Sequence, residues 1–382
     1  MATTIQHSDV ITRAAGGLAR EEVMKEFPVV GLSRRRATHE ITCGDARDGA
    51  PTLPQAHVAS TPTTAATFID LFCGIGGFRL AFEAAGATCS YACDIDGHAA
   101  RTYMANGGHT VDVTDIHVVD ALSIPDFDIL TAGFPCVGFS LAGVSKRNSL
   151  GRKHGLEGDQ GDLFFEVTRI LEARRPRAFL LENVANLVHH DRGRTFQTIM
   201  SSLCDLGYDV SWALLDAARL VPQHRERVYI AGFRDDTSID FDVRDITLPD
   251  LHPRLGDVLE ADVPDECTIS DRAWDSMRER RQRHARAGNG FGYKIANPDG
   301  VAPTLIAHYA KGGGDILIDQ GAGRNPRKLT VRECARLMGF PEWFEFPVAR
   351  THAYRQLGNA VCVPVVSVIA EQMIVALGRG EA

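Results

Sequence analysis

Between residues 67 and 234, short apolar runs alternate with longer amphipathic segments, and no other feature restricts the fold of this chain as strongly. The apolar runs have the length of buried strands, and the segments between them repeat with the period of a helix. This alternation is typical of βαβ units, which form a parallel sheet covered by helices. We expect strands at 67–71, 88–93, 129–132, 178–182, 209–215 and 227–232, and helices at 77–85, 97–104, 161–173 and 195–206.

The first predicted strand ends in a glycine-rich turn, residues 72–77, which leads into the first helix. Glycine lets the backbone approach a ligand closely, and a helix N-terminus offers free N–H groups. The G-x-G-G spacing differs from the G-x-G-x-x-G of dinucleotide sites. The turn is compatible with NAD, FAD or S-adenosylmethionine, or with no ligand. Asp94 ends the next strand, where a carboxylate can bind ribose hydroxyls, and Asp70 could receive the positive methionine portion of S-adenosylmethionine.

A second loop carries the strongest candidate for covalent chemistry. The residues Gly133-Phe134-Pro135-Cys136 follow the predicted strand 129–132. Open α/β sheets bind their ligands at the carboxyl ends of the strands. Cys136 is therefore a candidate nucleophile, although a lone cysteine is more often a buried structural thiol.

The composition excludes several classes of protein. The chain has 382 residues, which is long enough for two domains. Its nine cysteines include no C-x-x-C pair, so we expect reduced thiols, no disulfide framework and no metal site. We find no signal peptide and no apolar run long enough to cross a bilayer. These observations predict a cytoplasmic protein without a membrane partner.

Charge is distributed unevenly along the chain. The net charge of −8 does not suggest a nucleic-acid-binding protein. From residue 271 to residue 340, however, Lys and Arg outnumber Asp and Glu almost two to one. Such a stretch presents a basic face to a polyanion, or it is a solvated surface helix around residues 278–283. Charge alone leaves both interpretations open.

We divide the chain into four parts. Residues 1–66 form an N-terminal extension that ends in a linker rich in Pro, Thr and Ala, and residues 67–255 form the main α/β domain. Residues 256–349 form a smaller, irregular and glycine-rich domain, and residues 350–382 return to the main domain as a helix. Within the last two parts we expect helices at 330–338, with Thr330 as N-cap, and at 355–377.

Six short motifs resemble those of the cytosine-C5 DNA methyltransferases and occur in that family's order. They are Asp70-Leu71-Phe72-x-Gly74-x-Gly76-Gly77-Phe78, Gly133-Phe134-Pro135-Cys136, Glu182-Asn183-Val184, Pro222-Gln223-x-Arg225-x-Arg227, Arg332-Glu333-x-x-Arg336-Leu337-x-Gly339-Phe340-Pro341 and Gln356-x-Gly358-Asn359-Ala360-Val361. Six matches in order, at compatible spacings, identify the chain as a member. The resemblance covers residues 68–370 and implies a Rossmann-like, S-adenosylmethionine-dependent methyltransferase fold with a small target-recognition domain. It also implies DNA (cytosine-5-)-methyltransferase activity (EC 2.1.1.37).

The resemblance also implies the roles of individual residues. Cys136 would attack C6 of a flipped cytosine, and Glu182 would be the partner of N3 that neutralises the charge developing there. Arg227 would hold O2, and Arg225 would support the loop. The residues implied at S-adenosylmethionine are Phe72, Gly74, Gly76, Gly77, Asp94, Ile95, Asp112, Val113, Leu163, Asn359 and Ala360. The residues implied at DNA are Ser145, Lys146 and Arg147, in a mobile loop at 142–161, and Gln223, Thr304 and Leu305.

The chain departs from the family pattern at two of these places. Val137 stands where Gln is usual after the Pro-Cys pair, which removes a side-chain amide from the loop. Ile95 stands where an aromatic residue is usual, so adenine would pack on an aliphatic side chain.

The implied partner is double-stranded DNA, read at a sequence such as CC(A/T)GG or CCNGG. We expect a monomer that belongs to a restriction-modification system with a cognate endonuclease, or an orphan or phage enzyme. A tRNA cytosine methyltransferase on the same scaffold is an alternative, but that branch lacks a sizeable recognition domain. The N-terminal extension could in addition repress transcription.

Overall fold

The computed structural model describes residues 66–107, 110–135, 162–237, 239–288, 292–312 and 316–379. The predictions for Cys136, for the loop 142–161 with Ser145, Lys146 and Arg147, and for nearly all of the N-terminal extension lie outside these residues.

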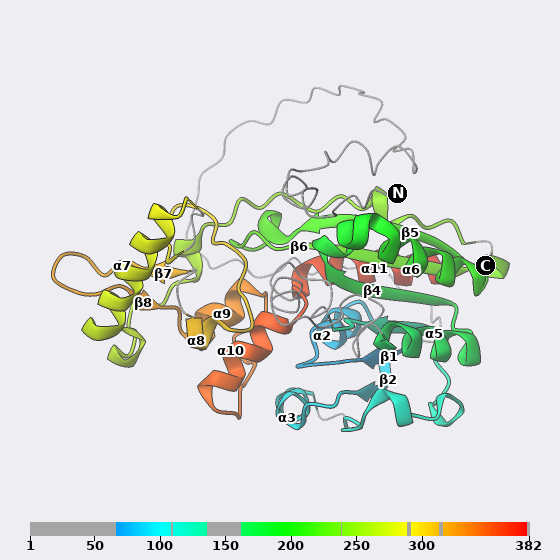
Figure 1. Ribbon diagram of the computed structural model, residues 1–382. Coiled ribbons are helices and arrows are strands. Elements are labelled where there is room, and N and C mark those ends of the chain that lie inside the picture. Colours follow the sequence, from blue (N-terminus) through cyan, green and yellow to red (C-terminus); the bar gives the residue numbers. More distant parts are fainter. Residues whose placement is uncertain are drawn as a thin grey trace, which may run out of the picture. The chain divides into compact units, whose positions relative to one another are not determined.

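A six-stranded sheet forms the centre of the fold, in the order β2-β1-β3-β4-β6-β5 (Figure 1). Its strands are β1 (Thr67–Leu71), β2 (Thr88–Cys93), β3 (Ile129–Ala132), β4 (Ala178–Val184), β5 (Tyr208–Asp216) and β6 (Glu226–Arg234). Each lies where the alternating pattern predicts a strand, and the α/β fold class is confirmed.

The prediction of an entirely parallel sheet is wrong for one strand. β1 pairs in parallel with β2 and β3, and β3 with β4, whereas β6 is antiparallel to both β4 and β5. The connection from β5 to β6, residues 217–225, is shorter than the dozen or so residues that a helical crossover needs. The chain therefore returns as a hairpin at this edge of the sheet.

The helices between the strands are α2 (Gly77–Ala84), α3 (Gly97–Ala105), α5 (Asp162–Arg174) and α6 (Arg194–Asp205). They match the predicted helices to within a residue or two at each end. Because β1, β3 and β4 are parallel, their carboxyl ends meet at one edge of the sheet. The turn after Leu71, the loop after Ala132 and the end of β4 therefore lie along that edge.

The C-terminal part differs from prediction. In place of one helix at 355–377, the structure has α10 (Arg350–Asn359) and α11 (Val363–Arg379), bent by 43°. Pro364 has no N–H and is tolerated only in the first turn of a helix, so it sits at the start of α11. The break at 360–362 leaves Asn359 as the last residue of α10 and Ala360 in the turn that follows, while α11 packs against α2.

The region 235–328 contains mostly short 3-10 turns. Its other elements are the long helix α7 (Asp271–Arg286), the short helix α8 (Tyr309–Gly312) and a two-stranded ladder of β7 (Leu317–Ile318) and β8 (Arg327–Lys328). No residue of α7 is buried, so the basic stretch at 278–283 does lie on a surface helix. The domain boundaries themselves stay a prediction.

Across the described ranges, no single helix has both the length and the apolar character needed to cross a membrane. Only α10 and α11 taken together, across their bend, reach that length and composition.

A buried ion pair holds the irregular region to the following helix, α9 (Val331–Leu337). The Arg327 guanidinium donates to both oxygens of Glu333, each at 2.8 Å, and neither side chain is more than 7% exposed. The Glu333 oxygens also accept from the backbone N–H groups of Thr330 and Glu260, at 2.8 Å each. Thr330 caps α9 as predicted, with its hydroxyl accepting from the Glu333 N–H. Glu333 therefore joins β8, α9 and the segment before α7.

We expect Glu333→Ala to lower the free energy of unfolding by about 3–5 kcal/mol, because it leaves the Arg327 charge buried and unpaired. Urea denaturation followed by circular dichroism measures the change. The matched control is Glu342→Ala, which removes a 64%-exposed partner of Arg336 and should cost about 0–1 kcal/mol. An equal loss of unfolding free energy in the two variants would show that the buried ion pair stabilises the protein no more than the exposed one.

Candidate active site

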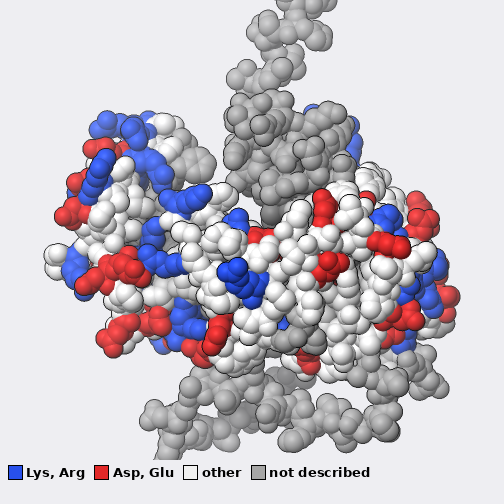
Figure 2. All heavy atoms as spheres, turned by 90° about the horizontal axis from the view of Figure 1, so that it is seen from below, with Lys and Arg blue, Asp and Glu red and all other residues white. Residues whose placement is uncertain are grey.

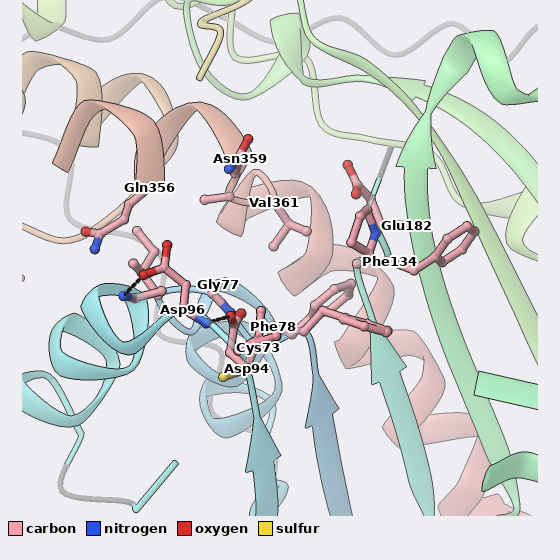
Figure 3. Close-up of a pocket in the computed structure, with 18 of the residues that line it drawn as sticks. Cys73, Gly77, Phe78, Asp94, Asp96, Phe134, Glu182, Gln356, Asn359 and Val361 are labelled. Carbon is pink, nitrogen blue, oxygen red and sulfur yellow. Dashed lines mark hydrogen bonds between the residues drawn. The ribbon is translucent and has the colours of Figure 1, made fainter. Parts of the chain in front are cut away.

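A pocket of about 490 Å³ lies along the carboxyl edge of the sheet. Its volume is in the range of small-molecule sites. Figure 3 shows Asp94 and Asp96 at one end of the pocket and Phe134 with Glu182 at the other, with Asn359 between them. The loops after β1, β2 and β3, the end of β4 and the segment around the break between α10 and α11 all contribute to its wall.

Asp94 fixes the backbone at the first end of the pocket. Its Oδ2 accepts from the N–H of Gly74 at 2.8 Å, and its Oδ1 accepts from the N–H of Asp96 at 2.7 Å (Figure 3). Phe72 and Gly74 both have a φ of 54° and Gly76 has a φ of 87°, so the turn after β1 is left-handed at three positions. Burial raises the pKa of Asp94, while these two N–H groups oppose the rise. One carboxylate thus ties the glycine turn to the turn after β2.

The C-terminal segment closes the pocket by close backbone approach. A Cβ at Gly77 would lie 2.6 Å from the Val361 side chain, and one at Gly358 would lie 2.3 Å from the Ala307 backbone N. Both positions therefore require glycine for contact. At the rim, Arg355 of α10 pairs with Asp96 at 2.5 Å, and the rings of His98 and His352 stack at 3.9 Å.

A carboxyl group and a guanidinium group meet at the second end of the pocket. Glu182, near the end of β4, is 8% exposed, and its Oε1 lies 3.1 Å from Nε of Arg227 on β6. Burial raises the pKa of Glu182, while the charges of Arg227 and Arg225 act in the opposite direction. The burial effect prevails, so the carboxyl retains its proton to higher pH than an exposed glutamate.

Arg225 also lines the pocket, but its guanidinium is bonded to backbone. It donates to the carbonyl oxygens of Leu305 at 3.2 Å, Gly358 at 3.2 Å and Ala360 at 2.7 Å. Burial lowers its pKa to about 10. The sequence pattern places Arg225 and Arg227 on one face of a strand, and both do reach the pocket. Arg225 precedes β6, however, and it holds two distant segments together.

Asn183 anchors the loop that leads toward Cys136. Its Nδ2 donates to the carbonyl oxygen of Phe134 at 3.1 Å, and both residues are buried. The sequence motif contains Asn183 but indicates no role for it. The contact ties the loop after β3 to the end of β4.

Comparisons with known proteins agree with this geometry. Residues 66–375 match the family of C-5 cytosine-specific DNA methylases. The chain belongs to that family. It is 45% identical over 310 residues to the Type II methyltransferase M.DsaV of Dactylococcopsis salina, covering 80% of this chain and 85% of the relative. It is 46% identical over 313 residues to the Type II methyltransferase M.NlaX of Neisseria lactamica, covering 81% and 96%.

Solved structures support the fold. The Dnmt2 methyltransferase of S. pombe superposes with a TM-score of 0.62 at 19% identity, over 82% of this chain and 99% of the other. The methyltransferase EhMeth of Entamoeba histolytica superposes with a TM-score of 0.65 at 18% identity, over 82% and 99%. The Rossmann-like methyltransferase fold is confirmed. By family, the protein is a DNA (cytosine-5-)-methyltransferase that uses S-adenosylmethionine as its co-substrate.

The pocket residues fit S-adenosylmethionine at the end near Asp94. Asp94, Asp96 and Asp115 line this end and suit the positive sulfonium and ammonium groups, while Ile95 and Ile116 provide apolar surface for adenine. Ile95 is 70% exposed, so a ligand face has room to cover it.

Most residues that the resemblance implies for the methyl donor line this pocket. They are Phe72, Gly74, Gly77, Asp94, Ile95, Leu163, Asn359 and Ala360. Three others lie outside the lining. The Cβ position of Gly76 points at the Tyr103 ring, 3.0 Å away, Asp112 accepts from the Tyr91 hydroxyl at 2.9 Å, and Val113 is half-exposed.

The residues implied at DNA are placed differently from expectation. Gln223 and Leu305 are fully buried, and the Leu305 N–H donates to Gln223 Oε1 at 2.7 Å. Neither has a surface for DNA in this structure, because Gln223 also donates to the Leu337 carbonyl. Thr304 is partly exposed and donates to the His224 carbonyl at 2.6 Å.

Several lining residues were not foreseen as site residues. They are Cys73, Ile75, Asp96, Thr114, Asp115, Ile116, His117, Arg355 and Gln356. Gln356 belongs to a quoted motif and could have been found from it. The segment 114–117 has no distinguishing pattern in the sequence.

Asp70 lies behind the pocket rather than in its wall. It is fully buried; its Oδ1 accepts from the Thr131 hydroxyl at 3.3 Å, and within the described residues its Oδ2 has no hydrogen-bond partner. Burial raises the pKa of Asp70 to about 8, although Thr131 and the charge of Arg79 oppose the rise. A direct contact with the methionine portion is therefore not supported.

We expect Asp70→Asn to remove a pH-dependent loss of stability. In an unfolded chain this carboxyl ionises near pH 4, whereas in the folded protein its pKa is about 8. The stabilisation that the protonated Asp70 carboxyl gives to the folded protein is complete below pH 4 and is lost as pH rises toward 8. The melting temperature of wild type should therefore fall relative to Asp70→Asn between pH 5 and pH 8. A constant difference across this range would contradict the raised pKa.

Proposed function

We propose that the protein transfers a methyl group to C5 of a cytosine flipped out of duplex DNA, through a covalent bond between Cys136 and C6. One observation carries the proposal: Glu182, Arg227 and Pro135, which directly precedes Cys136, line the same pocket as Asp94 and its neighbours. Group transfer requires donor and acceptor to be held together in one cavity.

The proposed chemistry begins at cytosine C6, because C5 alone is a weak nucleophile. The Cys136 thiolate bonds to C6, the C5–C6 double-bond electrons shift toward N3, and N3 takes a proton from Glu182. The product is an enamine that is nucleophilic at C5. S-adenosylmethionine supplies the methyl group as an electrophile. C5 bonds to that methyl group as its bond to sulfur breaks, and S-adenosylhomocysteine leaves. A water molecule then takes the C5 proton, the C5–H electrons re-form the C5–C6 double bond and expel the Cys136 thiolate, and Glu182 recovers its proton from N3.

Three further side chains would support this step. Arg227 lies beside Glu182, and we propose that its remaining N–H groups hold cytosine O2. Arg225 positions the turn with Asn359 and Ala360 through its carbonyl contacts. Asn183 positions the loop before Cys136. Extruding the base costs a few kcal/mol, which closure of the predicted loop 142–161 would offset.

We further propose that the enzyme protects DNA in a restriction-modification system, since the two relatives described above are named Type II methyltransferases. A cognate endonuclease would then cut the same sequence. Our proposal for that sequence remains CC(A/T)GG or CCNGG. Bisulfite sequencing of a genome in which the gene is expressed reports both the modified cytosine and its context.

We expect Cys136→Ser to retain DNA binding and to lose methyl transfer below detection, since a hydroxyl is a far weaker nucleophile than a thiolate. Duplex DNA containing 5-fluorocytosine at every cytosine should become covalently trapped on wild type in the presence of S-adenosylmethionine, and not on the variant. Cys204→Ser, at an exposed thiol, is the control and should trap normally. Wild type that never traps this DNA would refute the covalent step.

We expect Glu182→Gln to lower kcat by about 10²–10⁴-fold, the usual contribution of a general acid. S-adenosylmethionine binding should change little. Burial raises the pKa of Glu182, so the wild-type rate should decline as pH rises through that pKa, and the residual rate of the variant should not. Glu172→Gln, on the exposed side of α5, is the matched control. An unchanged pH profile in Glu182→Gln would remove Glu182 as the proton donor.

A further inference from the structure

Helix α7 (Asp271–Arg286) has no buried residue, which is unusual for a helix of its length. Surface helices normally bury one apolar stripe against the core. In α7 only Trp274, Met277 and His284 are partly buried, and six arginines occupy the rest of the helix. Burial against the core therefore does not account for the composition of α7.

One face of α7 packs against the chain that follows it. The rings of Trp274 and Tyr293 lie 4.5 Å apart, and the Arg281 guanidinium lies over the Tyr293 ring at 4.7 Å. A Cβ at Gly292 would lie 2.9 Å from Arg281 Cγ, so the backbone there lies directly against the helix. These contacts fix which side of α7 faces outward.

The outward side carries a row of arginines. At 100° per residue, Arg272, Arg283 and Arg286 lie on the side opposite Arg281, with Glu279 among them. All three arginines are exposed. In the part of the chain that the structure describes, none of the three takes part in an ion pair, whereas Arg278, nearer the packed side, pairs with Asp275. The row therefore carries a net positive charge, three arginines against the one carboxylate of Glu279.

Positive side chains also gather around α7 on the molecular surface. Figure 2 shows Lys and Arg gathered at one end of the lobe that contains α7, with Asp and Glu beside them and toward its other end. Arg272 and Arg286 are about 21 Å apart along the helix axis, at 1.5 Å per residue. That length matches the axial rise of about six successive phosphates of one DNA strand. Guanidinium groups bind phosphate in a bidentate manner.

We propose that the outward face of α7 binds the phosphate backbone of the substrate duplex and contributes affinity that does not depend on sequence. The inference rests on the proposed action on duplex DNA and adds to it a surface outside the pocket. Phosphate contacts position a protein on DNA without reading bases. Each such contact contributes about 0.9 to the slope of log K against log salt concentration. The row should therefore act on affinity and salt dependence, and leave the choice of site unchanged.

The test is the triple variant Arg272→Gln, Arg283→Gln, Arg286→Gln. The control variant Arg101→Gln, Arg244→Gln, Arg379→Gln removes the same charge from exposed positions on other elements. Affinity for two duplexes, with and without the methylated site, is measured from 50 to 200 mM salt. The α7 variant should lose roughly two to three units of salt slope and bind both duplexes more weakly by the same factor. The control should change by less than one unit.

An unchanged slope in a folded α7 variant, or an equal change in the control, would overturn the proposal. A loss confined to the duplex with the methylated site would also overturn it, because that pattern indicates base reading. Failure of wild type to methylate any duplex DNA would instead refute the proposed function, independently of the slopes.

Discussion

The guanidinium of Arg225 is the contact on which the shape of the pocket depends. Arg225 is only 2% exposed. Its guanidinium donates hydrogen bonds to three carbonyl oxygens that belong to segments far apart in sequence. One is Leu305, in the irregular region; the others are Gly358, near the end of α10, and Ala360, in the turn before α11. A lysine could not reach three carbonyls from one fixed plane, because its ammonium is a point donor. The charge also offsets the nearby carboxylate of Glu182.

This arrangement divides the pocket into two ends of opposite character. Carboxylates dominate the end near Asp94, and arginines accompany the single carboxyl at the other end. A cationic methyl donor and an electron-rich base with a carbonyl oxygen would each meet the complementary charge. Because both ends are built on the carboxyl edge of one sheet, the distance between them is set by strand spacing rather than by flexible loops.

The local hydrophobic pattern predicted the positions of strands and helices well, but it predicted strand direction and residue burial less well. The strands β1, β2 and β3 end where the apolar runs end, since burial on both faces leaves a clear signal. The direction of β6 was missed because an apolar strand has the same pattern whether its neighbour is parallel or antiparallel. The break before α11 was missed although Pro364 marks it. The family motifs brought most pocket residues together, but they could not reveal that Gln223 and Leu305 are buried against each other, because a motif records neighbours in sequence and not burial.

The environment of Glu182 explains why the site needs both arginines. A carboxyl that is buried alone would hold its proton too firmly to exchange it with a base during turnover. Arg227, at 3.1 Å, and Arg225 lower the pKa that burial raises, and such opposed effects bring a group toward the range in which it can both give and recover a proton. Burial lowers the pKa of Arg225 itself to about 10, but the side chain remains charged at neutral pH. The same residue thus holds the wall of the pocket in place and moderates the acid that the pocket contains.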